Sequence, residues 1–470
     1  MTHFDLAIIG SGSGNSLITP DWDDKKVAVI DGGTFGGTCL NVGCIPTKMY
    51  VYPAQLAAAA SDAARLGVDV TLDKVHWRDI RDRIFTRIDA ISTGGRRYRA
   101  EELDNVTLYD SHVRFVSEHA LETEDGQRIT ADQIVVAAGS RPVLPNIPGM
   151  DLPQVHTSDT VMRIPDLPER ILIIGGGYIA AEFGFVFSAF GAKVTMAARS
   201  GPLLRALDAT VSERFTEAVS KQWDVRLDTE VTSLMENPDG SVRASLEGPD
   251  GASTLDTDLV LVATGRVPNT DRLGIEAAGF DLRPDGRLAV DEFQRLLKGG
   301  KPVEGVWGLG DVSSDFQLKH VANHEARTVA HNLVHPENLK ASDHRFVPAA
   351  VFSSPQIASV GMTEEEACRD TEARGVELAL AVQEYGSTAY GWAMEDTTGF
   401  VKLLAEKESG KLLGAHIMGH EASMLIQPLI QAMSFGLDAA SMASGQYWIH
   451  PALTEVVENA LLSLKTGTGD

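Results

Sequence analysis

The sequence predicts an α/β protein with two Rossmann-like dinucleotide-binding domains and a smaller C-terminal α+β domain. Three observations support this fold. A glycine turn between two apolar strands occurs twice, first near residue 10 and again near residue 175. From about residue 345 the pattern changes to shorter alternating strands and helices. The chain has 470 residues, which is too long for one hydrophobic core.

Composition and charge limit the classes of partner. Hydrophobic residues make up 43% of the chain, which is a globular value. The formal net charge of −24 argues against nucleic acids and anionic membranes as partners, because both bind basic surfaces. We expect neither a signal peptide nor a membrane span, since no suitable apolar run occurs. Three cysteines in so long a chain indicate a reducing compartment, so we expect a cytoplasmic protein.

The first glycine turn has the pattern of a dinucleotide-binding fingerprint. We expect an apolar strand over residues 4–9, a glycine turn over 10–15 and a second strand over 27–30. The N–H groups of such a turn bind a pyrophosphate, and an acidic residue after the second strand binds the adenosine ribose. The expected contacts are Gly10, Ser11, Gly12, Gly14 and Asp31. Asn15 occupies the place of the third glycine, and Pro20 should end the intervening helix early.

The stretch GGTCLNVGCIPTK, residues 36–48, holds two of the three cysteines. Pro46 fits the first turn of a helix, so Cys39 and Cys44 should lie near a helix N-terminus, where the backbone favours a thiolate. In an ideal helix their Cα atoms would be roughly 8–9 Å apart, whereas a disulfide needs about 4.4–6.8 Å. The pair can therefore close only in a distorted turn, which Gly43 would allow.

A redox role is the favoured interpretation of this cysteine pair. The alternatives are two unrelated buried thiols or half of a metal site. No further cysteine-rich cluster exists to complete a metal site, so we expect none. Cys368 lies among acidic residues on an expected helix, and we expect it to be inert because negative charge disfavours a thiolate.

The segment between the two fingerprints should contain a long helix and then short strands. Alanine-rich and arginine-rich stretches at helical spacing predict one helix from residue 53 to about residue 100. Short strands are expected within residues 106–115 and 120–129. A buried strand then ends in Ala138 and Gly139, whose small side chains would let a cofactor approach the backbone.

The second glycine turn follows an expected strand over residues 171–174. Its next strand, residues 193–197, is followed by arginine rather than by an acid. An acid would favour the free 2′-hydroxyl of NADH, whereas arginine favours the 2′-phosphate of NADPH. Two surface arginines without a ligand are the alternative. The expected cofactor contacts here are Gly175, Gly177, Tyr178, Ile179, Ala180, Arg199, Arg205 and Gly265.

Two further groups lie in the second half of the chain. An apolar strand ends at Gly310 and Asp311, where a carboxylate can hold a ribitol hydroxyl. Near the C-terminus, Glu455 follows His450 closely enough to orient its imidazole. Taken alone this histidine would be a core residue, but with a redox dithiol and two nucleotide sites it becomes a general acid–base candidate.

Together these motifs resemble the pyridine nucleotide–disulfide oxidoreductase family over essentially the whole chain. The resemblance rests on GGTCLNVGCIPTK, both glycine fingerprints, Gly310–Asp311 and the HPALTE stretch at 450–455. It implies a homodimer with FAD and NADPH as cofactors. An FAD-binding domain would span residues 1–149 and 269–340, an NADPH-binding domain 150–268 and a dimerisation domain 341–470.

The resemblance also implies the catalytic roles. Hydride would pass from NADPH to the flavin and open the Cys39–Cys44 disulfide. Cys44 would face the flavin as a thiolate, and Cys39 would attack the substrate disulfide. His450 would come from the other subunit, held by Glu455, and would protonate the departing thiol.

Further roles concern the flavin environment. Lys48 and Glu182 would pair beside the flavin, although some relatives carry the lysine one position earlier, at Thr47. Tyr178 would be a gate that moves when the nicotinamide enters. The expected flavin contacts also include Gly33, Gly37, Thr38, Lys48, Val113, Ala138, Gly139, Gly310 and Asp311.

Local departures from the general pattern resemble the branch of the family that reduces mycothione, the disulfide of mycothiol. They lie at residues 13–16, 30–37 and 318–325, and include Asn15 and Lys319. Mycothione is therefore the favoured small-molecule substrate. Glutathione disulfide and lipoamide are alternatives, the latter disfavoured because such enzymes usually work with NAD. A redox-reporting flavoprotein that binds partners without turnover is a non-enzyme alternative, which the full set of catalytic residues disfavours.

Overall fold

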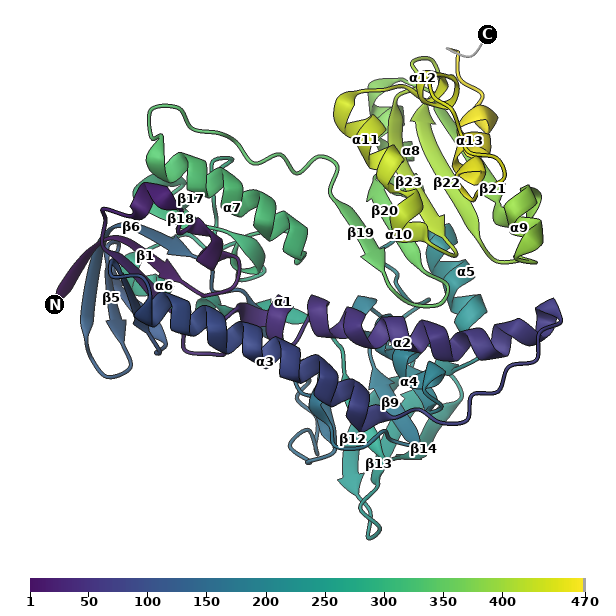
Figure 1. The fold of residues 1–470 in the computed structure, drawn as a ribbon, viewed down its shortest axis with the longest axis horizontal. Coiled ribbons are helices and arrows are strands. Elements are labelled where there is room, and N and C mark those ends of the chain that lie inside the picture. The colour runs from purple at the N-terminus through teal and green to yellow at the C-terminus, as the bar shows by residue number, and fades with distance from the viewer. Residues whose placement is uncertain (468–470) are drawn as a thin grey trace.

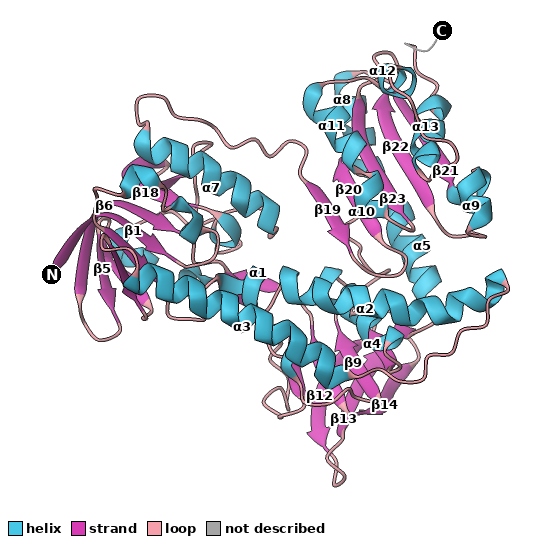
Figure 2. Cartoon of the chain, in the orientation of Figure 1, coloured by secondary structure: helices cyan, strands magenta, loops and turns pink. Residues whose placement is uncertain are grey.

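Three main sheets carry the fold in the computed structural model, which describes residues 1–467 (Figure 1). Two are built mainly from parallel strands and the third is antiparallel. Figure 2 shows the C-terminal sheet standing apart from the N-terminal one, with the long helices α2 and α3 extending beneath both. The arrangement confirms the predicted fold class. No helix within residues 1–467 is long and apolar enough to cross a membrane.

The first sheet has the strand order β17-β18-β6-β1-β2-β3, with β1, β2, β3, β6 and β18 parallel. Its apolar central strands are almost entirely buried, as expected for parallel strands covered on both faces. The strands expected at residues 4–9 and 27–30 are confirmed. The bounds are β1 Thr2–Ile9, β2 Val27–Ile30, β3 Val106–Tyr109, β4 Val113–Ser117, β5 Ala120–Thr123, β6 Arg128–Val136, β17 Arg295–Lys298 and β18 Lys301–Gly308.

The connection from β1 to β2 has no α-helix. It contains only two short 3₁₀ helices, η1 (Gly14–Leu17) and η2 (Pro20–Trp22). The expectation that Pro20 shortens this helix is confirmed. Proline has no N–H to donate to a preceding turn, so the helix ends before it. The helix α7 (Lys319–Val334) contacts η1.

The prediction of one helix from residue 53 to about residue 100 is wrong. The structure has α1 (Gly37–Asn41), α2 (Cys44–Ala63), η3 (Ala64–Leu66) and α3 (Trp77–Glu101). Gly67 ends the first part in a left-handed conformation, with φ +78°, and residues 67–76 are not helical. The stretch GVDVTLDKVH is rich in β-branched and aspartate residues, which favour helices least after glycine and proline.

The second sheet is entirely parallel, with the order β11-β10-β9-β15-β8. Its strands are β8 Val155–Thr157, β9 Arg170–Ile174, β10 Lys193–Ala197, β11 Asp224–Arg226 and β15 Leu259–Val262. Its helices are α4 (Tyr178–Ala189) and α5 (Ala209–Val219). A small antiparallel sheet of β12 (Glu230–Glu236), β13 (Val242–Gly248) and β14 (Gly251–Thr257) precedes β15.

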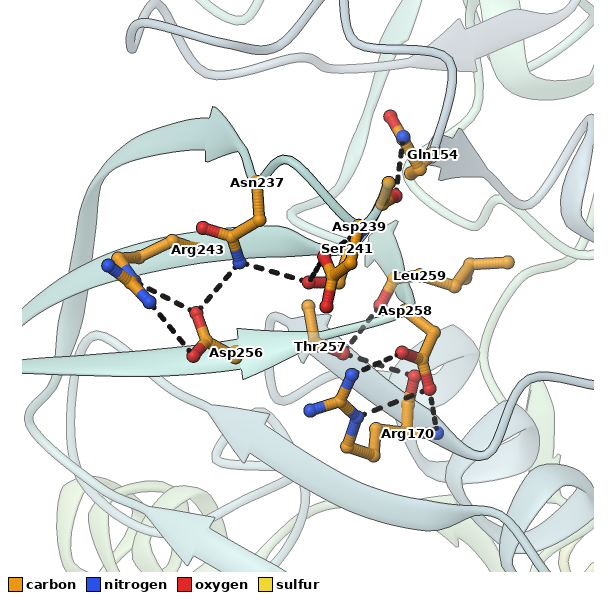
Figure 3. A network of polar contacts seen from close by, with 11 residues as sticks. Gln154, Arg170, Asn237, Asp239, Ser241, Arg243, Asp256, Thr257, Asp258 and Leu259 are labelled. Carbon is orange, nitrogen blue, oxygen red and sulfur yellow. Dashed lines mark hydrogen bonds and ion pairs between the residues drawn. The ribbon is translucent and has the colours of Figure 1, made fainter.

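Figure 3 shows the polar contacts that fasten this small sheet to the parallel one. Arg170, the first residue of β9, donates its backbone N–H to Asp258 at 2.9 Å and accepts from the Thr257 hydroxyl at 3.1 Å. Arg243 and Asp256 form an ion pair across β13 and β14. These contacts lie away from the glycine turn and fix the other end of the domain.

The third sheet is antiparallel, with the order β19-β20-β23-β22-β21. The antiparallel pairing expected for residues 400–404 and 411–418 is confirmed. Its strands are β19 Pro348–Val351, β20 Ile357–Gly361, β21 Leu378–Glu384, β22 Phe400–Glu406 and β23 Leu412–Met418. The helices here are α8 Glu364–Arg374, α9 Ala389–Ala393, α10 Ala422–Leu425, α11 Gln427–Phe435, α12 Ala439–Ser444 and α13 Thr454–Ser463.

A buried charge cluster joins the second and third sheets. Lys402 on β22 is 1% exposed, and its Nζ lies 2.7 Å from Oδ1 of Asp208 and 2.6 Å from Oε2 of Glu364. Asp208 also caps α5 by accepting from the Thr210 N–H. The pKa of Asp208 is lowered, because the Lys402 ammonium and the Glu364 N–H outweigh the effect of burial. Full pairing makes burial of these charges tolerable.

Minor elements complete the chain. The two-stranded sheet of β7 (Ser140–Pro142) and β16 (Arg266–Pro268) lies where the chain leaves and re-enters the first domain. The remaining short helices are η4 Val161–Arg163, η5 Asn269–Arg272, α6 Ile275–Ala278, η6 Gly310–Val312 and η7 Tyr385–Ser387.

Candidate active site

One cavity of about 1100 Å³ is lined by residues from all three sheet regions. Most residues predicted for the cofactors and the redox centre line it together. They are Gly10, Ser11, Gly12, Asp31, Gly33, Gly37, Thr38, Cys39, Cys44, Lys48, Val113, Ala138, Gly139, Gly177, Tyr178, Ile179, Glu182, Gly265, Gly310 and Asp311. Predicted residues outside this lining are Gly14, Gly175, Ala180, Arg199, Arg205, His450 and Glu455.

In the first glycine turn, backbone segments lie too close together for any side chain at the glycine positions. Gly10 has φ +104°, and a Cβ there would stand 2.3 Å from the Ala137 carbonyl oxygen. A Cβ on Gly37 would stand 2.7 Å from the Cα of Gly12. The turn and the segment that leads to the cysteines are thus in direct backbone contact, which only glycine permits.

Asp31 is fixed by the same turn. Its carboxylate accepts hydrogen bonds from the Ser11 N–H at 2.7 Å, the Ser11 hydroxyl at 2.5 Å and the Gly33 N–H at 2.8 Å. The Ser11 hydroxyl also accepts from the Gly36 N–H at 2.8 Å. An oriented carboxylate on the cavity wall next to a glycine cradle fits a dinucleotide with its ribose and diphosphate.

The second glycine turn has the same backbone contact. Gly175 has φ +131°, and a Cβ there would lie 2.3 Å from the Ala263 carbonyl oxygen. Arg199 and Arg205 are both exposed in the segment after β10. Arg205 donates to the Ser200 hydroxyl at 2.9 Å, and neither guanidinium forms an ion pair with the carboxylates of residues 1–467. Two uncompensated cations beside a nucleotide turn fit an additional phosphate.

The two cysteines lie on either side of a break between helices. Cys39 is in α1, Cys44 is the first residue of α2, and Gly43 between them has φ −134° and ψ −123°. A Cβ on Gly43 would come within 2.9 Å of the Thr38 carbonyl oxygen. The distorted turn expected at Gly43 is therefore present. Both cysteines are free thiols in this structure.

The two thiols have opposite acidity. A hydrogen bond from Cys39, supported by the positive charge of Lys48, lowers the pKa of Cys44 from 9.0 to about 7. The same hydrogen bond and burial raise the pKa of Cys39, while Lys319 acts in the other direction. Cys44 is therefore the thiol that ionises first.

A partly buried ion pair crosses the cavity from the first domain to the second. The Lys48 ammonium lies 2.7 and 2.6 Å from the two carboxylate oxygens of Glu182. Glu182 also accepts from the Phe352 N–H at 3.0 Å, and Lys48 lies 4.5 Å from the centroid of the Phe352 ring. Thr47, the alternative lysine position, donates to the Gly43 carbonyl at 2.7 Å. The pair thus ties α2, α4 and the chain after β19 together.

Asp311 lies in η6, shortly after β18, and lines the cavity. It accepts from the Ser140 hydroxyl at 2.6 Å, and Arg266 donates to that hydroxyl at 2.8 Å. Ser140 and Arg266 were not predicted as site residues, because these contacts join residues 171 and 126 positions apart, and no local pattern records them.

His450 does not line the cavity of its own chain. Its Nδ1 lies 2.6 Å from Oε1 of Glu455, as expected, and its side chain is 72% exposed. The other oxygen of Glu455 is buried and has no hydrogen-bond partner within residues 1–467. Tyr447 and Ile449 are also exposed nearby. The imidazole is oriented but presented to the outside of the protomer.

Comparison with known proteins identifies this arrangement. The family described as pyridine nucleotide-disulphide oxidoreductase matches residues 4–326, and its dimerisation domain matches residues 347–461. The chain belongs to this family. The protein is a disulfide oxidoreductase with FAD and NADPH as cofactors, and the dimerisation domain indicates a homodimer.

Individual relatives cover the chain from end to end. The mycothione reductase of Mycobacterium tuberculosis (strain H37Rv) is 52% identical, over 99% of this chain and 100% of the relative. The glutathione reductase of Burkholderia cepacia is 32% identical, over 96% of this chain and 97% of the relative. The flavoprotein disulfide reductase RclA from Escherichia coli has a TM-score of 0.84 at 25% identity, over 98% of this chain and 99% of that one.

The residues that line the cavity of this family member fit its cofactors. The first glycine cradle, Asp31 and Asp311 line one continuous cavity with Cys44, as a flavin dinucleotide requires. Tyr178 and Ile179 at the start of α4 line the same cavity beside Glu182, and burial raises the pKa of the Tyr178 hydroxyl.

Proposed function

We propose that this family member reduces mycothione to mycothiol with NADPH. The 52% identity to a mycothione reductase over the whole of both chains carries the proposal. The departures at Asn15 and Lys319 support it, because both side chains are used structurally. Asn15 accepts from Arg99 at 2.8 Å, and Lys319 donates to Ser13 at 2.7 Å.

The proposed chemistry assigns a different task to each cysteine. When bound, FAD supplies the reducing equivalents of NADPH to the cysteine pair. Cys39 would then attack one sulfur of mycothione while its proton passes to His450 of the partner subunit, and one mycothiol is displaced as a thiolate. Cys44 attacks the resulting mixed disulfide, which releases the second mycothiol and forms the Cys39–Cys44 disulfide. The low pKa of Cys44 supports its role as the resident thiolate.

His450 of the partner subunit would protonate the first departing thiol. The support is its position: the imidazole is held by Glu455 yet is 72% exposed and outside its own chain's cavity. Such a group is outside its own active site and available to that of a neighbouring protomer. The dimer would therefore hold two composite sites, and each protomer alone would be inactive.

The proposal includes a domain division and a compartment. We assign residues 1–149 and 269–340 to FAD, 150–268 to NADPH and 341–470 to dimerisation. In support, the first sheet draws strands from both FAD segments, and the dimerisation match begins at residue 347. We also propose the cytoplasm, where reducing conditions keep mycothiol reduced.

Substrate specificity gives the direct test. Purified dimer is assayed for NADPH oxidation with mycothione, glutathione disulfide and lipoamide. We expect turnover with mycothione and at most about a hundredth of that rate with the other two, since a site built for polar groups rejects analogues lacking them strongly. Comparable rates with glutathione disulfide would contradict the substrate assignment.

Two cysteine variants separate the redox centre from the rest of the molecule. Cys39→Ser should abolish disulfide reduction and retain bound FAD. Cys368→Ser is the control, because Cys368 is exposed on α8 outside the cavity, and its activity should equal that of the wild type. Residual mycothione reduction by Cys39→Ser would reject the mechanism.

A further inference from the structure

The first glycine turn lacks the helix that normally follows it. In an ordinary dinucleotide fingerprint the N-terminus of an α-helix points at the diphosphate and contributes about half a positive charge. Here only the four-residue η1 follows, and Pro20 begins another short 3₁₀ helix. The second turn, by contrast, opens the 12-residue α4. The diphosphate end of the first site therefore lacks its usual helix dipole.

Lys319 lies where this charge is missing. It is the first residue of α7, lines the cavity, and donates from Nζ to the Ser13 hydroxyl at 2.7 Å. Ser13 immediately precedes η1 and lines the cavity as well. The lysine thus places an ammonium group on the glycine turn from a helix that lies 306 residues further along the chain.

The Lys319 ammonium forms no ion pair with a carboxylate among residues 1–467. The other half-buried or buried lysines of the cavity region are neutralised: Lys48 by Glu182, and Lys402 by Asp208 and Glu364. Lys319 is half-buried, its hydrogen bond goes to the neutral Ser13 hydroxyl, and its charge also acts on the Cys39 thiol, whose pKa is raised by other groups. Partly desolvating a charge is unfavourable without a counter-charge, so its environment points to an anionic ligand in the cavity.

Arg99 supports the same turn in a different way. It donates to the side-chain and backbone oxygens of Asn15 at 2.8 and 3.2 Å. It does not line the cavity, so it holds the turn in place without reaching a ligand. Among residues 1–467, Lys319 alone combines contact with the turn, access to the cavity and a positive charge without a carboxylate partner.

We propose that Lys319 binds the diphosphate of FAD and supplies the positive charge that the shortened crossover helix lacks. This role does not depend on which disulfide is reduced. The residue is a cofactor-binding group of this chain, and the glycine turn with Ser13 is the frame that holds it.

Cofactor binding by the full-length chain tests the role. FAD is removed from the wild type and from Lys319→Met, and FAD, ADP and adenosine are titrated back by calorimetry. Loss of one charge-assisted hydrogen bond should weaken FAD and ADP binding by about tenfold to a hundredfold. Adenosine has no diphosphate, and its affinity should not change. The affinity of wild type for FAD should also fall with salt more steeply than that of the variant.

Matched variants keep the test decisive. Lys319→Arg retains the charge and should bind FAD within about threefold of the wild type. Arg327→Gln removes an exposed positive charge from the same helix, outside the cavity, and should change nothing. Unchanged FAD and ADP affinity in Lys319→Met would overturn the proposal. A loss for FAD without a loss for ADP would also overturn it, because Lys319 would then act on the flavin ring or on Cys39.

Discussion

The two dinucleotide-binding units begin alike and then diverge. In each, a glycine with positive φ follows the first strand, and an added Cβ would stand 2.3 Å from the carbonyl oxygen of the residue that follows a neighbouring strand. After the turn, the first unit has the four-residue η1 and the second the 12-residue α4. After the second strand, the first has Asp31 and the second Arg199.

This difference separates what the fold requires from what the ligand requires. The glycine is needed in both units because two backbones meet there. The following helix can be shortened where another element, here α7 with Lys319, reaches the same turn. We propose that the residues after the second strand, Asp31 in the first unit and Arg199 with Arg205 in the second, decide which ribose is accepted.

The largest effect should come from replacing the first glycine of either turn, Gly10 or Gly175, by alanine. Gly10→Ala should prevent stable FAD binding, because the new Cβ would overlap the Ala137 oxygen. Gly175→Ala should retain FAD but lower kcat/KM for NADPH by at least about a hundredfold, since overpacking and a positive φ are both unfavourable. Flavin absorbance and steady-state kinetics measure the two properties separately.

A third glycine provides the control for these variants. Gly126 also has positive φ, at +81°, but a Cβ there meets nothing within 4 Å. Gly126→Ala should therefore cost only about 1 kcal/mol of stability. If Gly175→Ala released FAD as readily as Gly10→Ala, the two units would not be independent.

The next largest effect concerns the buried charge cluster at Lys402, which joins the second unit to the C-terminal domain. Lys402→Met should destabilise the fold by about 3–5 kcal/mol, because it leaves Asp208 and Glu364 facing each other without a cation. Chemical denaturation of the purified dimer measures this loss. The exposed pair of Arg214 and Glu384 joins the same two regions, and Arg214→Lys should cost less than about 1 kcal/mol. Equal effects of the two variants would contradict the importance of burial.

A moderate effect is expected at the ribose-selecting position of the second unit. The double variant Arg199→Ala and Arg205→Ala should lower kcat/KM for NADPH by about tenfold to a hundredfold, as hydrogen bonds to a charged phosphate are removed. The value for NADH should remain nearly constant. Lys221→Ala removes an exposed cation after α5, paired with Glu217, and should change neither value. A parallel loss for NADH would show that the arginines act structurally.

The smallest effect concerns the pH at which the Cys44 thiol of the first unit ionises. Because the pKa of Cys44 is lowered from 9.0 to about 7, its thiolate should appear with a midpoint near 7 in alkylation by iodoacetamide with peptide mapping. Because folding lowers this pKa, the Cys44 thiolate also stabilises the folded protein. This contribution is fully present above pH 9 and is lost as the pH falls through 7. Lys48→Met should raise the midpoint. Gly175→Ala should not, since both cysteines belong to the first unit, and a shift there would contradict this separation.

Many structural features of this protein could be predicted from short-range patterns in its sequence. The strands around both glycine turns, the shortened connection at Pro20 and the distorted turn at Gly43 all depend on one residue's backbone geometry, so a local pattern predicts them. The single helix from residue 53 was wrong for a related reason. The prediction relied on the helical spacing of alanine and arginine and neglected the β-branched stretch near residue 70. It also placed the start of the helix at Pro53, whereas α2 begins at Cys44.

Only the tertiary structure brought together residues far apart in the sequence. Lys319 meets Ser13, Ser140 meets Asp311, and Lys402 meets Asp208. Each of these contacts depends on which strand lies beside which in a sheet, and no local pattern records that order. The sequence by itself thus determined the two nucleotide turns and the redox pair, because each is formed by residues that are close together in the chain. Folding decided where polar side chains end up: Lys402 is enclosed by carboxylates of its own chain, whereas Lys319 faces the cavity and His450 faces the outside of the protomer.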